Sequence, residues 1–428
     1  MSEGQTVQTS RRGFLQALGL GVAGLAVGWP FRADAQAAWN GRLLLYVHAS
    51  GGWDPTSFCD PKGRETADSP EPVNHYLTSE IRTANAPSPL TWAPMAANEA
   101  FFQTYGDRLL VINGLDTSTN GHESGTRYAC SGTLADTHPA LAALYAGVFA
   151  ADKSMPFLTN GAFDSTRGVV ARTRVSNMSA LDRLADTQDV GNSTHILPPD
   201  TMARIAQANA DRETARLAAP LLPRERLEHG KFTSAARTTE NGISRLKAQL
   251  PDLNTFATAL GKQGAIALAA WRAGLSASAQ LTIGGFDTHS NHDNNQSTAL
   301  TALTQGLGEV MREIARLNAE GDVVVVVGSD FGRTPVYNDG NGKDHWPVTS
   351  MVALGAGIRG NRVIGGSTPD FRARAVDPAH FQPVDGSANG VVLTPAHVHR
   401  ALRTLLGLTG TTLDQQFPIN VEELGLFA

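Results

Sequence analysis

Four compact apolar runs along the chain predict buried strands. The runs cover residues 43–48, 109–112, 279–283 and 323–327, and the last consists of five consecutive valines. Continuous runs rich in β-branched residues are typical of strands that are buried on both faces, as in a parallel sheet. A turn that contains glycine follows each run, so we expect the chain to change direction there.

Helical patterns rich in alanine and leucine lie between the predicted strands. The stretch 298–317 has the spacing of an amphipathic helix and leads directly into the valine run. Strands that alternate with helices predict an α/β fold with a mainly parallel sheet. Helical patterns without a clear strand occupy about 197–278, which predicts a helical insertion within a single domain over 36–428. The other expected helices cover 137–151, 200–219, 224–250, 255–275 and 395–406.

The composition of the 428 residues narrows the class of protein. Hydrophobic residues make up 41% of the chain, which is enough for a large core and argues against wholesale disorder. The formal net charge of −5 argues against a nucleic-acid partner, because nucleic-acid-binding proteins normally carry a basic excess. The two cysteines cannot build a disulfide scaffold, a zinc-finger array or an iron–sulfur centre. A redox enzyme is the least favoured class, because no GxGxxG motif follows a predicted strand.

Residues 1–35 have the pattern of an export signal. The pair Arg11-Arg12 precedes an apolar stretch over 17–31, and the sequence Ala33-Asp34-Ala35 follows it. A basic start, an apolar middle and a small-x-small cleavage site are typical of secretory signals, and paired arginines indicate the twin-arginine translocase as the export partner. The alternative is an uncleaved anchor, but the stretch is short for ~30 Å of hydrocarbon and contains glycines. We expect a periplasmic or extracellular protein with no stable membrane span after cleavage.

The predicted compartment bears on the two cysteines. An oxidising environment permits a disulfide between Cys59 and Cys130, the only pairing that the chain allows. Unpaired cysteines are also among the most often buried residues, so two buried free thiols are an equal alternative.

Acidic residues and histidines follow the predicted strands. In α/β sheets, ligands bind at the carboxyl ends of parallel strands, so these side chains are expected to face one site. Carboxylates suit Mg²⁺ and Ca²⁺, whereas imidazole suits zinc or manganese. Each residue alone could be a helix cap or a hydrogen-bonded core residue, but together they predict a site for one or two divalent metal ions. The candidate ligands are Asp54, Asp287, His289, His292, Asp330 and His345, and His122 lies on the loop after another predicted strand.

Five short segments resemble the exported domain-of-unknown-function family 1501, in the same order along the chain. The two most specific are SDFGRTP at 329–335 and DHWP at 344–347. That family is grouped with the alkaline phosphatase and sulfatase superfamily. The resemblance implies a doubly wound α/β core and metal-assisted phosphoryl or sulfuryl transfer. The remaining segments are GGWD at 51–54, NGHE at 120–123 and GFDTH at 285–289.

The resemblance also implies roles for individual residues. Asp54 resembles the metal-binding aspartate that follows the first strand, and Asp330 resembles the aspartate shared with a second metal. Asp287, with His289 or His292, resembles an aspartate–histidine pair for one metal, which His345 completes. Two further residues are candidates from their chemistry alone. His122 could act as an acid/base or anion-binding group, and Arg333 could clamp an anionic substrate bidentately or pair with a neighbouring carboxylate.

Two positions depart from the superfamily pattern. Gly121 stands where many relatives carry a serine before the histidine, and Phe331 stands where many have a histidine after the aspartate. Ser124 and Thr126 lie nearby without an obvious match to the missing nucleophile. Two hypotheses follow. One is an exported metal-dependent hydrolase of small anionic phosphate- or sulfate-ester-like substrates, in which water activated by a metal ion attacks directly. The other is a non-catalytic exported scaffold or ligand-binding protein that retains the fold.

Overall fold

A computed structural model describes residues 39–427 except 71, 86, 162, 175–197, 227, 231–241, 243–244 and 385–389. The predicted signal at 1–35 lies outside the described residues. Residues Ala37–Ala428 form one compact unit. Among the helices that the structure describes, none has the length and apolar character needed to span a membrane.

The centre of this unit is a sheet to which eight strands contribute within the described residues. Two of its pairings are antiparallel, and both are made by β11; the other pairings are parallel. This arrangement confirms the predicted α/β fold with a mainly parallel sheet. The order across the sheet is β12 (Arg362–Gly365), β4 (Leu110–Asp116), β11 (Val348–Gly355), β8 (Val323–Ser329), β1 (Leu43–Ala49), β7 (Ser278–Ile283), β5 (Phe157–Thr159) and β6 (Arg172–Arg174).

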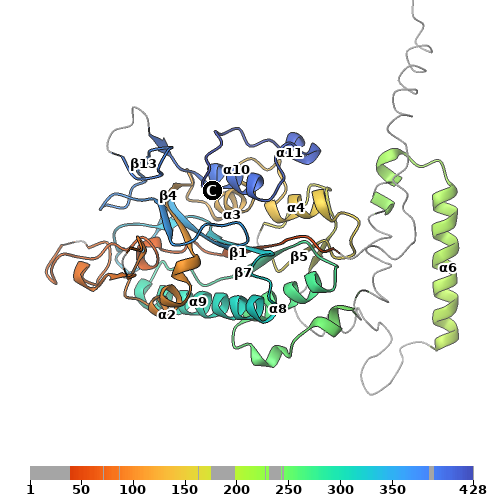
Figure 1. Cartoon of the computed structure of the whole chain (residues 1–428), viewed down its shortest axis with the longest axis horizontal. Helices are drawn as coiled ribbons and strands as arrows, with labels where there is room; N and C mark the ends of the chain where they lie inside the picture. The colour runs from red at the N-terminus through yellow and green to blue at the C-terminus, as the bar shows by residue number, and fades with distance from the viewer. Residues whose placement is uncertain are drawn as a thin grey trace, which may run out of the picture. The chain divides into compact units, whose positions relative to one another are not determined.

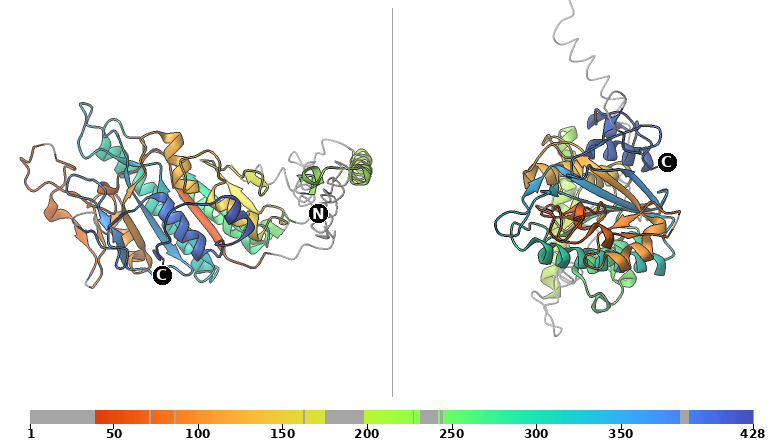
Figure 2. Two further views of the ribbon diagram at one scale, coloured as in Figure 1. Left: turned by 90° about the horizontal axis from the view of Figure 1, so that it is seen from above. Right: turned by 90° about the vertical axis from the view of Figure 1, so that its left-hand side faces the viewer.

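Helices cover both faces of the sheet (Figures 1 and 2). The alternating side chains of β1 divide between two hydrophobic clusters, with Leu43, Leu45 and Val47 in one and Leu44 and Tyr46 in the other. The sheet is therefore doubly wound, as the resemblance implied. The first cluster contains residues of α2 (Asn98–Tyr105), α8 (Ala259–Arg272) and α9 (His292–Arg316), and the second contains residues of α3 (His122–Ser131), α4 (Leu141–Phe149) and α10 (Pro395–Leu405).

Most of the predicted elements are present with shifted ends. The four apolar runs are β1, β4, β7 and β8, and the helix predicted over 200–219 is α6 (Pro199–Ala218), shifted by one residue. Part of the helix expected over 224–250 lies outside the described residues. Helix α9 begins six residues before the predicted start, because its first turns, HDNNQST, are polar and carry no apolar period. Four strands of the central sheet were missed; three of them, β5, β6 and β12, are only three or four residues long.

The two cysteines do not form the disulfide that the predicted compartment would permit. Both are buried free thiols. The sulfur of Cys59 lies 3.6 Å from Oδ1 of Asn113, whereas the sulfur of Cys130 lies 3.8 Å from Nδ1 of His48. The two thiols thus contact different partners, and the second of the two alternatives is the one observed.

The strand ends that precede the acidic residues meet at one edge of the sheet. In the parallel register, Ala49 of β1 lies opposite Ile283 of β7 and Ser329 of β8. The loops after these three strands therefore start side by side. Gly51 lets the first two loops approach closely, because a Cβ there would lie 2.5 Å from the backbone nitrogen of Asp287 and its φ is +117°.

Candidate metal centre

Four side chains converge beyond the carboxyl ends of the strands. His122 is the first residue of α3, Asp287 and His289 lie on the loop after β7, and His345 starts the short strand β10 (His345–Trp346). Nε2 of His289 lies 3.0 Å from both Oδ1 of Asp287 and Nε2 of His345. Nε2 of His345 lies 3.4 Å from Oδ1 of Asp287, and Nε2 of His122 lies 3.5 Å from its Oδ2. We call these four residues the His/Asp cluster.

The opposite nitrogen of each imidazole is held by an oxygen acceptor. Nδ1 of His122 lies 2.7 Å from Oδ2 of Asp330, and Nδ1 of His289 lies 2.7 Å from Oδ1 of Asp344. Nδ1 of His345 lies 2.7 Å from the backbone oxygen of Asn120. Acceptors at all three Nδ1 atoms favour the tautomer with the proton there, which turns the lone pair of each Nε2 towards the cluster. Metal-binding histidines are typically oriented in this way.

The spacing of three of the four side chains fits one metal ion, because donor atoms of His122, Asp287 and His345 all lie within 4.8 Å of one another. Donor atoms that bind zinc tetrahedrally at roughly 2.0–2.1 Å lie about 3.4 Å from one another. Nε2 of His289 lies 3.0 Å from donor atoms of two of these residues, Asp287 and His345. Two facing Nε2 lone pairs, on His289 and His345, repel each other unless a cation lies between them. A donor set of three imidazoles and one carboxylate suits zinc or manganese better than Mg²⁺ or Ca²⁺, which prefer oxygen ligands.

Nearby charges and burial keep Asp287 and His345 in the protonation states that bind metal ions. Burial by itself raises the pKa of Asp287, but the hydrogen bond and charge of Arg333, with the nearby His122 and His289, outweigh it and lower that pKa. Burial lowers the pKa of His345, and the charge of Arg333 adds to this effect. The carboxylate is therefore ionised and the imidazole neutral near pH 7. The Asp287 side chain is 49% exposed, so solvent and solutes reach the cluster.

Asp330 lies behind the cluster, with both carboxylate oxygens already engaged. Its Oδ2 lies 2.7 Å from Nδ1 of His122 and accepts from the backbone nitrogen of Gly51. Its Oδ1 lies 2.6 Å from Nε2 of the buried His48. Asp330 was predicted to be a metal ligand, both from its position after a strand and from the family resemblance, whereas here it orients His122.

His48, which contacts Asp330, was not among the site residues predicted from the sequence. Burial lowers its pKa, but the neighbouring Cys130 and Asp330 outweigh burial and raise the pKa to about 10. A protonated His48 then neutralises the Asp330 carboxylate. One signal for His48 was present in the sequence: it is a histidine in an otherwise apolar run that predicts a strand buried on both faces, where polar side chains are uncommon.

Asp54 and His292 form a separate buried group with Lys343. Oδ2 of Asp54 lies 2.7 Å from Nζ of Lys343 and 3.0 Å from Nε2 of His292, and all three side chains are inaccessible to solvent. Burial raises the pKa of Asp54, but Lys343 and His292 outweigh it and lower that pKa well below its usual range. The ammonium group supplies the cation that this carboxylate needs. We therefore place Asp54 and His292 outside the metal site that was predicted to include them.

Arg333 is buried and cannot act as the predicted clamp on a substrate. Its guanidinium donates to the backbone oxygens of Gly51, Gly52 and Lys343 and, over 2.7 Å, to Oδ1 of Asp287. The alternative, an ion pair with a neighbouring carboxylate, is the one observed. Arg333 fixes Asp287 through Oδ1 and leaves Oδ2 turned towards His122.

The start of α3 lacks the nucleophile of the superfamily pattern. Gly121 is the N-cap residue and His122 opens the helix. Ser124, the nearest substitute, is engaged by Oγ1 of Thr119 at 2.6 Å and donates to the backbone oxygen of Gly121. Phe331, which stands where many relatives have a histidine, packs against the cluster. The centre of its ring lies 4.4 Å from that of His345 and 4.9 Å from that of His122.

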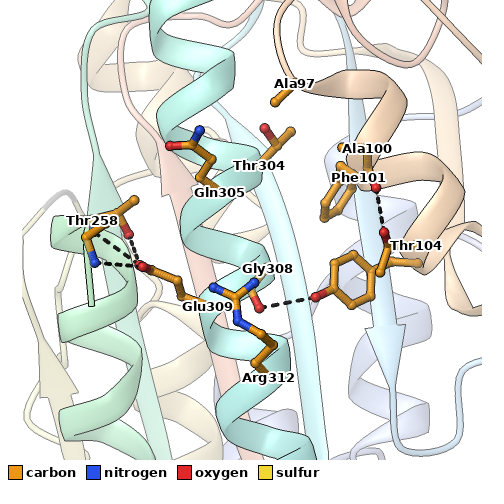
Figure 3. Close-up of a pocket in the computed structure, with 12 residues that line it drawn as sticks. Ala97, Ala100, Phe101, Thr104, Thr258, Thr304, Gln305, Gly308, Glu309 and Arg312 are labelled. Atoms are coloured by element: carbon orange, nitrogen blue, oxygen red, sulfur yellow. Dashed lines mark hydrogen bonds between the residues drawn. The ribbon is translucent and has the colours of Figure 1, made fainter. Parts of the chain in front are cut away.

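A pocket of about 410 Å³ lies elsewhere, between α2, α8 and α9 (Figure 3). No member of the His/Asp cluster lines it. Its acidic residue, Glu309, accepts hydrogen bonds from the backbone nitrogens of Ala257 and Thr258 at the start of α8. Because this carboxylate stabilises a helix end, we place the chemistry at the strand ends and not in this pocket.

Comparison with known families and structures supports part of the sequence interpretation. The model of the family described as "Protein of unknown function (DUF1501)" matches residues 200–385, which confirms the resemblance over that stretch. No curated protein matches the chain. The chain is similar to a sulfatase from Pseudoalteromonas sp., at 8% identity over 91% of this chain and 72% of that one, with a TM-score of 0.40.

Two other solved structures show similarity of the same degree. The lipoteichoic acid synthase LtaP from Listeria monocytogenes is 12% identical over 87% of this chain and 74% of its own, with a TM-score of 0.37. A TAB5 alkaline phosphatase variant with Mg bound is 9% identical over 75% of this chain and 92% of its own, with a TM-score of 0.30. Similarity at this level does not decide an activity, which has to be argued from the His/Asp cluster.

Proposed function

We propose that this chain, whose residues 200–385 match family DUF1501, is an exported metal-dependent hydrolase of small phosphate- or sulfate-ester-like substrates. The observation that carries the proposal is the convergence of three imidazole Nε2 atoms and one carboxylate, each imidazole with its Nδ1 held by an acceptor. His122, Asp287, His289 and His345 would hold the ion. Export by the twin-arginine route, to the periplasm or cell surface, is supported by the pattern of residues 1–35.

A divalent metal bound by these residues would supply Lewis-acid polarisation of an ester oxygen and a lowered pKa for water. The chain's own residues keep that site defined. Arg333 fixes one oxygen of Asp287, Asp330 orients His122, and Asp344 orients His289. One ligand carboxylate only partly neutralises a divalent cation, so the loaded site would attract an anion. This favours anionic esters as the class of substrate.

The first experiment measures metal and turnover together. We expect purified mature protein to contain zinc or manganese by elemental analysis, and to hydrolyse at least one member of a panel of phosphomonoesters, phosphodiesters and sulfate esters. Asp287→Ala should lose both the metal and the activity. Asp370→Ala, which changes an exposed aspartate paired with Arg372, is the matched control and should keep both. A metal-free wild-type protein would contradict the proposal.

A second candidate function is a metal- or ligand-binding protein without turnover. The observation in its favour is the helix start, where Gly121 replaces a nucleophile and Ser124 is held by Thr119. This candidate predicts metal binding by the His/Asp cluster with no hydrolysis across the same panel. Any turnover that depends on metal and is abolished by Asp287→Ala would exclude it.

A further inference from the structure

Lys343 is a charged residue with no access to solvent. Its Nζ donates to Oδ2 of Asp54 at 2.7 Å and to Oδ1 of Asn74 at 2.9 Å. Lysine is almost never fully buried unless it is paired, because removing an ammonium group from water is costly. Lys343 lies two positions before His345, so we asked which parts of the His/Asp cluster its contacts hold in place.

The backbone of Lys343 connects the two segments that carry the cluster. Its nitrogen donates to the backbone oxygen of Thr288 over 3.1 Å, and Thr288 lies between Asp287 and His289. Its oxygen accepts from Nη1 of Arg333, the residue that holds Asp287. The next residue, Asp344, binds Nδ1 of His289.

Asp54 reaches the same two segments by a second route. Oγ1 of Thr288 lies 2.8 Å from Nδ1 of His292, and Nε2 of His292 lies 3.0 Å from Oδ2 of Asp54. The single oxygen Oδ2 is thus contacted by the side chain of Lys343 from one segment and, through His292, by Thr288 from the other. The ion pair lies at the point where both routes meet.

We propose that Lys343 is a positioning residue, whose ion pair with Asp54 sets the relative placement of segments 287–289 and 343–345 so that their ligand atoms converge. This inference rests on the proposed metal site and adds the interaction that prepares it. The pair acts through backbone and side-chain contacts and does not itself touch the metal or the substrate.

The test removes both charges of the pair. Lys343→Met alone would leave the Asp54 carboxylate buried without a cation and could prevent folding. The informative protein is the double variant Lys343→Met/Asp54→Asn, because replacing both members of a buried pair is often neutral for stability. We expect it to fold, by circular dichroism, and to bind zinc about 10–100-fold more weakly in chelator competition. The visible absorption spectrum of the Co²⁺-loaded variant should also differ from that of wild type, because the coordination geometry changes.

A matched control comes from another buried ion pair in the chain. Nη1 of Arg403 lies 2.9 Å from Oδ1 of Asp414, and neither residue contacts the His/Asp cluster. Arg403→Met/Asp414→Asn should keep wild-type zinc affinity and the wild-type Co²⁺ spectrum. Wild-type affinity and spectrum in Lys343→Met/Asp54→Asn would overturn the positioning role and leave the metal site standing. Failure of the wild-type protein to bind zinc, manganese or Co²⁺ would overturn both.

Discussion

Nε2 of His48 lies 2.6 Å from Oδ1 of Asp330, and both side chains are buried. The contact follows from the pairing of β1 with β8, in which His48 lies opposite Gly328 and Asp330 comes two residues later. The other oxygen of Asp330 holds Nδ1 of His122. A residue in the interior of a strand therefore stabilises the orientation of a cluster histidine through one intermediate carboxylate.

Replacing His48 should destabilise the fold and weaken the cluster. His48→Leu leaves the Asp330 carboxylate buried without its cationic partner, and breaking a buried pair in this way typically costs about 3–5 kcal/mol. We expect a loss of this size in the free energy of unfolding, measured with urea, together with weaker zinc binding. His48→Gln keeps a polar side chain beside Asp330 and should recover part of the loss. Equal stability of His48→Leu and wild type would show that the contact is not an ion pair.

Replacing Asp344, the acceptor of Nδ1 of His289, should change metal binding but not the stability of the fold. Asp344 is mostly exposed, and its hydrogen bond with His289 lowers its pKa, so it is ionised at neutral pH. Asp344→Asn should weaken zinc binding about 10–100-fold, as is typical when a partner of a ligating histidine is lost. Stability without metal should change little, because exposed pairs contribute about 0–1 kcal/mol. Chelator competition and thermal unfolding of the metal-free protein measure the two effects, and an unchanged affinity would count against His289 as a ligand.

The location of the acidic residues and histidines at one edge of the sheet could be predicted from the sequence. Parallel strands have their carboxyl ends at the same edge, whatever the order of the strands in the sheet. This rule places Asp287 and Asp330 near each other once β7, β1 and β8 are recognised as buried runs. Strand β11 was missed since Thr349 and Ser350 interrupt its apolar run. Both are buried and satisfied, by Nε1 of Trp53 and by Oδ1 of Asn113, partners that no local pattern reveals.

The roles of individual residues were harder to predict from the sequence, because they depend on partners that are distant in the chain. Asp54 has the sequence context of a metal ligand, but Lys343, almost three hundred residues away, lies where a cation would be. Arg333 has the chemistry of an anion clamp, but backbone oxygens of Gly51 and Gly52 accept its donors. Burial and saturation of polar groups are properties of the folded contacts, so the residue type and spacing alone leave them open.

The close approach of the two ligand-bearing segments depends on Gly342. A Cβ at this position would lie 1.9 Å from the backbone oxygen of His289. Gly342→Ala should therefore push the segments apart, lower the melting temperature and weaken zinc binding. Gly321→Ala is the matched control, because a Cβ there meets no atom within 4 Å. The prediction fails if the two variants bind zinc equally well.

A histidine remote from the cluster should make the protein less stable in acid. His399 is buried, and its Nε2 lies 2.7 Å from the backbone oxygen of Ala129. Burial, with a smaller effect of Arg403, lowers the pKa of His399 to about 4. The unfolded chain takes up this proton near pH 6.5 and the folded chain only near pH 4, so unfolding is favoured increasingly as the pH falls between these values.

The size and sign of this effect can be isolated with a variant that cannot titrate. A shift from about 6.5 to about 4 corresponds to about 3 kcal/mol, present in full above pH 6.5 and lost as the pH falls to 4. In urea unfolding of the metal-free proteins, the free energy of unfolding of wild type minus that of His399→Gln should therefore fall by about 3 kcal/mol between pH 7 and pH 4. His380→Gln, which changes a histidine that is 77% exposed, controls for the general effect of acid and should follow wild type. A constant difference between wild type and His399→Gln across this range would show that His399 is not held neutral by its burial.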